Sequence, residues 1–195
     1  ANIIINISAS PFHCDKVIDR KNIIKYQISK FSVPFLYCNL VGGQDEVIFD
    51  GQSLAFNNKG NLIAIGKAFS EDLVEFDLDS NNELKFALNN KESQLYNALK
   101  LGIKDYFKKT GYNRAVIGLS GGIDSALTAT IAADALGNEN VIGISMPSKY
   151  SSNHSLDDAK SLARNLNIEY KVLPIHSLHK STLDTLKPFF IDTKE

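Results

Sequence analysis

The residues that could support chemistry most directly are Ser-Gly-Gly-Ile-Asp-Ser at 120–125. They follow an apolar run at 115–119 and precede an alanine-rich stretch, a pattern that predicts a strand, a tight loop and a helix. Adjacent glycines allow a sharp turn with exposed backbone N–H groups, and the N-terminus of a helix favours anions. The serine hydroxyls add hydrogen-bond donors with little bulk. The segment therefore predicts a phosphate-binding loop.

An acidic residue inside this loop adds a second expectation. Asp124 would repel a phosphate unless a divalent cation lay between them, so we predict Mg²⁺ held by Asp124. The loop is not a P-loop, because Ile123 and Asp124 stand where that motif has Lys and then Ser or Thr. The alternative is a purely structural turn, with Ser120 or Asp124 capping the helix.

Composition limits the class of protein. The 195 residues are 44% apolar and carry a formal net charge of -1, without a block of like charge. We therefore expect a globular protein with no nucleic-acid or membrane partner. Two cysteines, Cys14 and Cys38, are too few for a disulfide framework, and Cys38 within an apolar strand is predicted to lie in the core. A reducing, cytoplasmic location is expected.

Apolar periodicity divides the chain into a strand-rich half and an alternating half. In the first half we predict a helix at 15–31 and strands at 3–7 (buried on both faces), 34–41, 47–49, 53–56, 62–67 and 74–78. Residues 79–90 are rich in Asn, Asp, Ser and Lys and are predicted to form a linker. Beyond it we predict helices at 92–110, 125–136 and 155–166 and strands at 115–119, 141–145 and 170–173. Strands that alternate with helices indicate a parallel sheet, expected here to be covered on both faces.

Four stretches carry a resemblance to known families. Leu-Ser-Gly-Gly-Ile-Asp-Ser resembles the SGGxDS loop of N-type ATP pyrophosphatases. The stretch from Gly143 to Leu166, which contains "MPSKYSS", resembles a segment of glutamine-dependent NAD synthetases. "NISASPFHCDK" and "YCNLVGGQDEVIFDGQS" are similar to the carboxyl-terminal part of a nitrilase-like amidase domain. The resemblance implies an α/β fold. The end of an α-β-β-α amidase domain (1–78) and a linker (79–90) would precede the start of an adenine nucleotide alpha hydrolase-like, Rossmann-like domain (91–195).

The resemblance implies a ligase that amidates nicotinic acid adenine dinucleotide (deamido-NAD) to NAD, using ATP, Mg²⁺ and glutamine-derived ammonia. ATP would be bound by Gly118, Leu119, Ser120, Gly121, Gly122, Ile123, Asp124 and Ser125. Glutamine would contact Ser10 and Lys16. Deamido-NAD, glutamine and ATP are thus the expected partners, in a homo-oligomer when the protein is full length.

The resemblance also implies that no catalytic residue lies in this chain. The Glu-Lys-Cys triad of the amidase is expected before Ala1, so we expect an interior segment that is inactive alone. Asp45, Glu46 and Asp50 lie close together and could do acid–base work, but the resemblance makes their segment structural. Two alternatives stay open: another glutamine-dependent adenylating ligase of the GMP or asparagine synthetase type, or a non-catalytic nucleotide-binding fragment.

Overall fold

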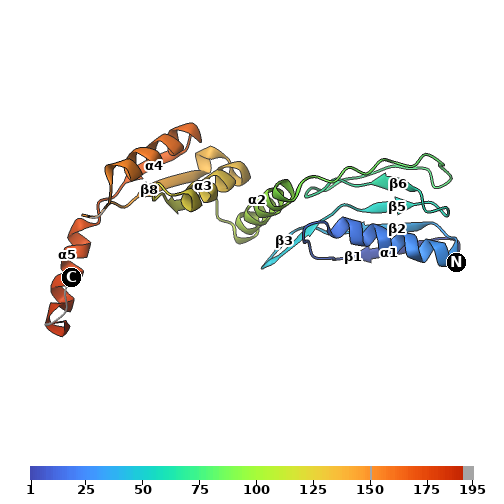
Figure 1. The fold of residues 1–195 in the computed structure, drawn as a ribbon, viewed down its shortest axis with the longest axis horizontal. Helices are drawn as coiled ribbons and strands as arrows, with labels where there is room; N and C mark the ends of the chain where they lie inside the picture. The colour runs from blue at the N-terminus through green and yellow to red at the C-terminus, as the bar shows by residue number, and fades with distance from the viewer. Residues whose placement is uncertain (150, 191–195) are drawn as a thin grey trace. The chain divides into compact units, whose positions relative to one another are not determined.

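A computed structural model describes residues 1–149 and 151–190 (Figure 1). These residues form two compact units, unit 1 at 1–110 and unit 2 from Gly111 onward. The predicted linker, 79–90, contains no helix or strand, but the division between the compact units comes later, after Thr110. Residues 191–195 of the predicted second domain lie outside the described residues.

Unit 1 contains a four-stranded sheet with the order β1-β2-β5-β6. Its strands are β1 (Ile4–Ser8), β2 (Phe35–Asn39), β5 (Leu54–Phe56) and β6 (Leu62–Ile65). β1 and β2 are parallel and are joined by α1 (Lys16–Phe31), which lies along the sheet (Figure 1), while the other pairs are antiparallel. A separate hairpin is formed by β3 (Val41–Gln44) and β4 (Val47–Asp50).

The core of unit 1 lies between α1 and one face of this sheet. Val17, Ile24 and Ile28 recur at helical spacing and are at most 3% exposed. They pack in one cluster with sheet residues Phe35, Tyr37, Leu54, Phe56 and Leu62. The predicted helix is confirmed, and its apolar residues Ile18 and Phe31 lie outside this buried face and are exposed.

Three expectations for unit 1 are wrong, two of them for one reason. Side chains of a strand alternate between faces, and α1 covers only one face of the sheet. Ile5 and Ile7 point away from α1 and are 62% and 85% exposed, so β1 is not buried on both faces. Cys38 likewise is exposed between the buried Tyr37 and Asn39. The third error is the strand at 74–78, where the chain forms no strand.

The last helix of unit 1, α2 (Lys91–Thr110), packs against the β3–β4 hairpin. The Asp105 carboxylate accepts a hydrogen bond of 2.8 Å from the Gly43 backbone N–H, and the Lys109 ammonium donates to the Gly43 carbonyl. A Cβ atom at Gly43 would lie 3.1 Å from the Gly102 Cα atom, so helix and hairpin approach closely through glycine. These contacts hold α2 in unit 1.

Unit 2 has the predicted β-α-β-α-β order. β7 (Ala115–Gly118), β8 (Val141–Ser145) and β9 (Glu169–Val172) form a parallel sheet in that order. α3 (Ile123–Leu136) and α4 (Asn153–Asn165) connect them, with short 3-10 helices at Asn138–Asn140 and Lys187–Phe189. The helix α5 (His176–Leu186) follows β9 and was not predicted. No helix in the described part of the chain combines the length and apolar character needed to cross a lipid bilayer.

The sheet of unit 2 is covered on one face, not on both as expected. Small residues of the two helices, Ala129 and Ala132 of α3 and Ala159 and Ala163 of α4, share one core cluster with Val141. Consecutive parallel strands joined by right-handed crossovers place both helices on the same face. Val116, on the opposite face, is 63% exposed.

We expect Leu62→Ala to lower the free energy of unfolding of unit 1 by about 2–5 kcal/mol, because Leu62 is 1% exposed and its removal leaves a cavity. Asn58→Ala, in the exposed turn of the same β5–β6 hairpin, should change it by less than about 0.5 kcal/mol. Denaturant unfolding of the full-length protein would measure both. Equal effects of the two substitutions would contradict the described core.

Candidate functional site

The predicted phosphate-binding loop lies at the carboxyl edge of the unit 2 sheet, between β7 and α3. Leu119 is buried, and its backbone N–H donates to the Ile144 carbonyl at 2.8 Å. The Ser145 hydroxyl at the end of β8 donates to the Leu119 carbonyl at 2.7 Å. Both groups of the Leu119 backbone are therefore tied to β8, which fixes the point where the loop departs.

Two serine hydroxyls hold the loop in shape. The Ser120 backbone N–H donates to the Ser125 hydroxyl at 3.2 Å, and the Gly122 N–H donates to the Ser120 hydroxyl at the same distance. The Ser125 hydroxyl also donates to the Gly122 carbonyl at 3.0 Å, and the two hydroxyls are 3.1 Å apart. Short side chains that can both donate and accept are needed for these bonds, which explains the serines at 120 and 125.

The start of α3 leaves donors free for an anion. Its N-cap is Gly122, which makes no side-chain cap bond, so neither Ser120 nor Asp124 caps the helix as the structural alternative predicted. Within the described residues, the backbone N–H groups of Ile123 and Asp124 have no hydrogen-bond partner. Free N–H groups and the positive end of the helix dipole together attract negative charge. The Asp124 side chain is exposed beside them.

A cavity of about 310 Å³ opens next to this loop. It is lined at the ends of β7 and β8 and at the start of α4 by Leu119, Ser120, Ser145, Met146, Pro147, Ser151, Ser152, Ser155 and Leu156. Five of these side chains are serine hydroxyls, so the cavity offers short donors and acceptors next to the apolar Met146. Its position outside the carboxyl ends of parallel strands is where open α/β sheets bind ligands.

Gly121 connects the loop to the start of α4. Its φ is +82°, and a Cβ atom there would lie 2.4 Å from the Ser155 carbonyl oxygen. The backbone of α4 thus approaches the loop at a distance that only glycine allows. The hydroxyl of Ser152 caps α4 by accepting from the Ser155 N–H at 3.2 Å.

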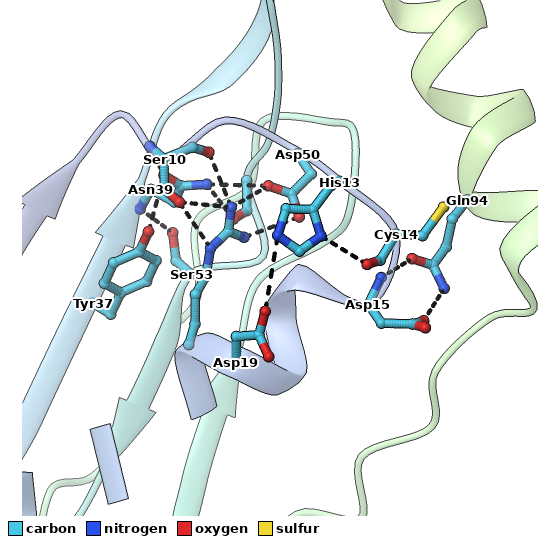
Figure 2. Close-up of polar contacts among 12 residues, drawn as sticks. Ser10, His13, Cys14, Asp15, Asp19, Tyr37, Asn39, Asp50, Ser53 and Gln94 are labelled. Atoms are coloured by element: carbon cyan, nitrogen blue, oxygen red, sulfur yellow. Dashed lines mark hydrogen bonds and ion pairs between the residues drawn. The ribbon is translucent and has the colours of Figure 1, made fainter. Parts of the chain in front are cut away.

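The residues predicted to contact glutamine lie in unit 1, between β1 and α1. The Ser10 backbone N–H donates to Asn39 Oδ1 at 2.9 Å (Figure 2). The Ser10 hydroxyl accepts from the Arg20 side chain at 3.3 Å. Lys16 is the first residue of α1 and is half-buried. In the described part of the chain its ammonium group has no ion-pair or hydrogen-bond partner, so it is available to a ligand.

Sequence reasoning missed the polar group that surrounds Ser10. Arg20 and Asp50 form an ion pair with side chains 4% and 2% exposed, and Asn39 donates to Asp50 Oδ1 at 3.2 Å. The signal was present, because Arg20 lies among Val17, Ile24 and Ile28 on the apolar face of α1. A buried charge at such a position requires a partner. The structural interpretation of Asp50 fits this pairing.

Neither cysteine is placed as an activated nucleophile. Cys14 is half-buried and Cys38 exposed, and both are free thiols. The His13 ring is bonded to the Cys14 carbonyl oxygen at 2.9 Å rather than to its sulfur. In residues 1–149 and 151–190, no three His, Cys, Asp or Glu side chains gather as a metal site.

We expect Gly121→Ala to destabilise unit 2 more than Gly60→Ala destabilises unit 1. Both glycines have φ +82°, so both substitutions cost about 1–2 kcal/mol for the left-handed conformation. Only Gly121 has backbone in the way, since nothing lies within 4 Å of a Cβ at Gly60. Thermal unfolding of the two full-length variants measures the difference. Equal losses would contradict the described contact with Ser155.

Comparison with known proteins places this geometry in a family. A model described as NAD synthase matches residues 95–194, just over half of the chain. Glutamine-dependent NAD(+) synthetase of Synechocystis sp. is 44% identical, with 98% of this chain and 35% of that protein covered. For that of Thermotoga maritima the values are 38%, 97% and 39%. The chain thus spans little more than a third of these relatives.

Solved structures agree with the predicted fold class. Glutamine-dependent NAD+ synthetase from Acinetobacter baumannii, solved with adenosine diphosphate, matches with a TM-score of 0.92 and 35% identity over 100% of this chain and 38% of that one. The enzyme from Cytophaga hutchinsonii shares the fold, with a TM-score of 0.83 and 21% identity over 98% and 39% of the two chains. The expected α/β architecture, a nitrilase-like part followed by a Rossmann-like parallel sheet, is confirmed. This chain belongs to the NAD synthase family.

Proposed function

We propose that the full-length protein is a ligase that amidates deamido-NAD to NAD, consuming ATP and glutamine. The observation that carries this proposal is the loop 118–125, where free N–H groups, small hydroxyls and one carboxylate meet at the carboxyl edge of a parallel sheet. The names of the relatives support it, as does the adenosine diphosphate in the Acinetobacter baumannii structure.

Amide formation needs activation of the carboxylate, because oxide is a poor leaving group. In the proposed reaction the nicotinate carboxylate attacks the α-phosphate of ATP, the bond to pyrophosphate breaks, and ammonia then displaces AMP. The backbone N–H groups of Ile123 and Asp124 would bind the departing pyrophosphate, because they point outward at the positive end of α3. Gly121 and Gly122 let the phosphates approach the backbone.

Residues of the loop fit a magnesium ion. The Asp124 carboxylate is exposed and lies next to free N–H donors, and Mg²⁺ is commonly bound by one or two carboxylates together with substrate phosphates and water. Asp124 would hold the ion, which when bound neutralises charge on the pyrophosphate. The serines shape the loop and leave the carboxylate free.

Ammonia would come from glutamine bound near Ser10 and Lys16 in unit 1. Ammonium predominates at neutral pH and is not a nucleophile, so release of ammonia within the protein has a chemical advantage. We propose glutamine, ATP and deamido-NAD as the ligands of a cytoplasmic homo-oligomer with no nucleic-acid or membrane partner. Cys14 and Cys38 take no part in this chemistry.

The proposal is tested by ATP–pyrophosphate exchange with the full-length protein. We expect exchange in the presence of deamido-NAD and none with xanthosine monophosphate or aspartate, the acceptors of GMP and asparagine synthetases. Exchange with xanthosine monophosphate and none with deamido-NAD would overturn the proposed substrate.

We expect Asp124→Asn to lower kcat for NAD formation by about 100-fold or more, because the loop loses the charge that holds the metal at the pyrophosphate. Glu139→Gln removes an acidic residue beyond the opposite end of α3 and should change kcat by less than about twofold, because Glu139 lies outside the loop and the cavity. Pyrophosphate release at saturating substrates, titrated with Mg²⁺, is the measurement. Equal kcat values for Asp124→Asn and the unsubstituted protein would refute the assigned role.

A further inference from the structure

The hydrogen bonds of Ser10 leave one of its polar groups free. Its backbone N–H donates to Asn39 Oδ1 at 2.9 Å, and its carbonyl accepts from Arg20 Nη2 at 3.0 Å. Its hydroxyl oxygen accepts from Arg20 Nε at 3.3 Å and from Nη2 at 3.2 Å. A guanidinium has donors only, so the hydroxyl proton must point elsewhere. In this setting Ser10 can meet a ligand only as a hydrogen-bond donor.

Arg20 is held rigidly by residues from three other parts of unit 1. Its Nη1 donates to Asp50 Oδ2 at 2.9 Å, and Nη2 lies 2.8 Å from Asp50 Oδ1, which makes the pair bidentate. The guanidinium also lies over the Tyr37 ring, 5.7 Å from its centroid. Asn39 bonds both Asp50 and the Ser10 backbone, so the group forms one connected network (Figure 2).

The charge of Arg20 is already balanced. Its partner Asp50 is 1% exposed, and the two side chains together are neutral within the protein. Arg20 itself is 5% exposed, so it does not reach a ligand. Its influence on a ligand must therefore pass through the groups that it orients, and Ser10 is the half-buried residue among them.

We propose that Arg20 is a positioning residue for glutamine, resting on the proposed function and on the assignment of Ser10 and Lys16 to that ligand. Arg20 fixes the Ser10 hydroxyl as a donor, and the Lys16 ammonium also has donors only. Both residues would thus bind acceptor oxygens of glutamine, and the positive charge of Lys16 favours the α-carboxylate over the neutral carboxamide oxygen. The ammonium group of glutamine must be bound by other residues.

The test is a double-mutant cycle on the full-length protein with Arg20→Lys and Ser10→Ala. Lysine keeps the charge next to Asp50 but loses the guanidinium fork that serves Asp50 and Ser10 together. We expect each single variant to raise KM for glutamine about tenfold. Because Arg20 acts through Ser10, the double variant should be no weaker than Ser10→Ala alone. Glutamine-dependent and ammonia-dependent NAD formation are measured in parallel. The ratio of the two rates separates a loss of glutamine use from a loss of the amidation reaction.

If the increases in KM caused by the two single substitutions multiply in the double variant, the inference is overturned. A general loss of structure on substitution of Arg20 would raise KM whether or not Ser10 is present. Should Arg20→Lys fail to fold, the variant Arg20→Met with Asp50→Leu replaces the buried pair by apolar side chains, a change that proteins often tolerate. It too should raise KM for glutamine, and an unchanged KM would contradict the inference. Lys30→Met, at the exposed end of the same helix, is the matched control and should leave KM unchanged.

The two proposals fail in different ways. If the unsubstituted full-length protein forms NAD from ammonia but not from glutamine, the role of Arg20 is overturned and the proposed amidation is left intact. If the unsubstituted protein forms NAD from neither nitrogen source, the proposed function itself is overturned.

Discussion

Parallel pairing of strands is the constraint on which both candidate sites depend. A parallel pair cannot be closed by a short hairpin and requires a crossover, here a helix in each case: α1 between β1 and β2, α3 between β7 and β8, and α4 between β8 and β9. Each crossover creates a strand-to-helix turn at the carboxyl edge of the sheet. Ser10 lies in the first of these turns and Lys16 begins the helix that follows it. Residues 120–125 span the second turn and the first residues of α3.

The two turns are held by different chemistry. In unit 2, hydroxyls and glycines close a small exposed loop and leave backbone N–H groups free, as suits a ligand with many anionic oxygens. In unit 1, Arg20 hydrogen-bonds the Ser10 carbonyl and hydroxyl of the turn and forms a buried, neutral ion pair with Asp50. Such a pair is costly to break on one side, because the remaining charge would be buried alone.

Helix α2 belongs to both descriptions of the chain. The NAD synthase model begins at residue 95, within this helix, whereas packing assigns the whole helix to unit 1. Asp105 and Lys109 bind the two backbone groups of Gly43, and Gln94 accepts from the Asp15 N–H at 3.0 Å, next to Lys16. The family match therefore begins at residue 95, before unit 1 ends at Thr110. Sequence similarity and side-chain packing place the boundary at different residues.

Local pattern determined much of this protein. Helical spacing in α1 and α2, the β-α-β-α-β order of unit 2 and the glycine turn at 121–122 were all predicted from the sequence, because each depends on residues close together in the chain. The strand at 74–78 was wrong because alternation of apolar and acidic residues does not by itself supply a partner strand. Which face of a sheet is covered was also beyond local pattern, so Ile5, Ile7 and Cys38 were placed wrongly.

Only the tertiary structure decided the polar contacts between distant segments. Arg20 and Asp50 are 30 residues apart, and Ser10 and Asn39 are 29 apart. The residues adjacent to Arg20 in the sequence do not identify Asp50 as its partner. The charge of Arg20 on the apolar face of α1 shows only that a partner is required. The contact between Gly121 and Ser155 is of the same kind: the sequence specified a residue able to turn, and the packing of α4 made glycine necessary there. Local sequence determines which conformations a segment can adopt. Contacts between side chains that are distant in the sequence determine which polar groups those segments bring together.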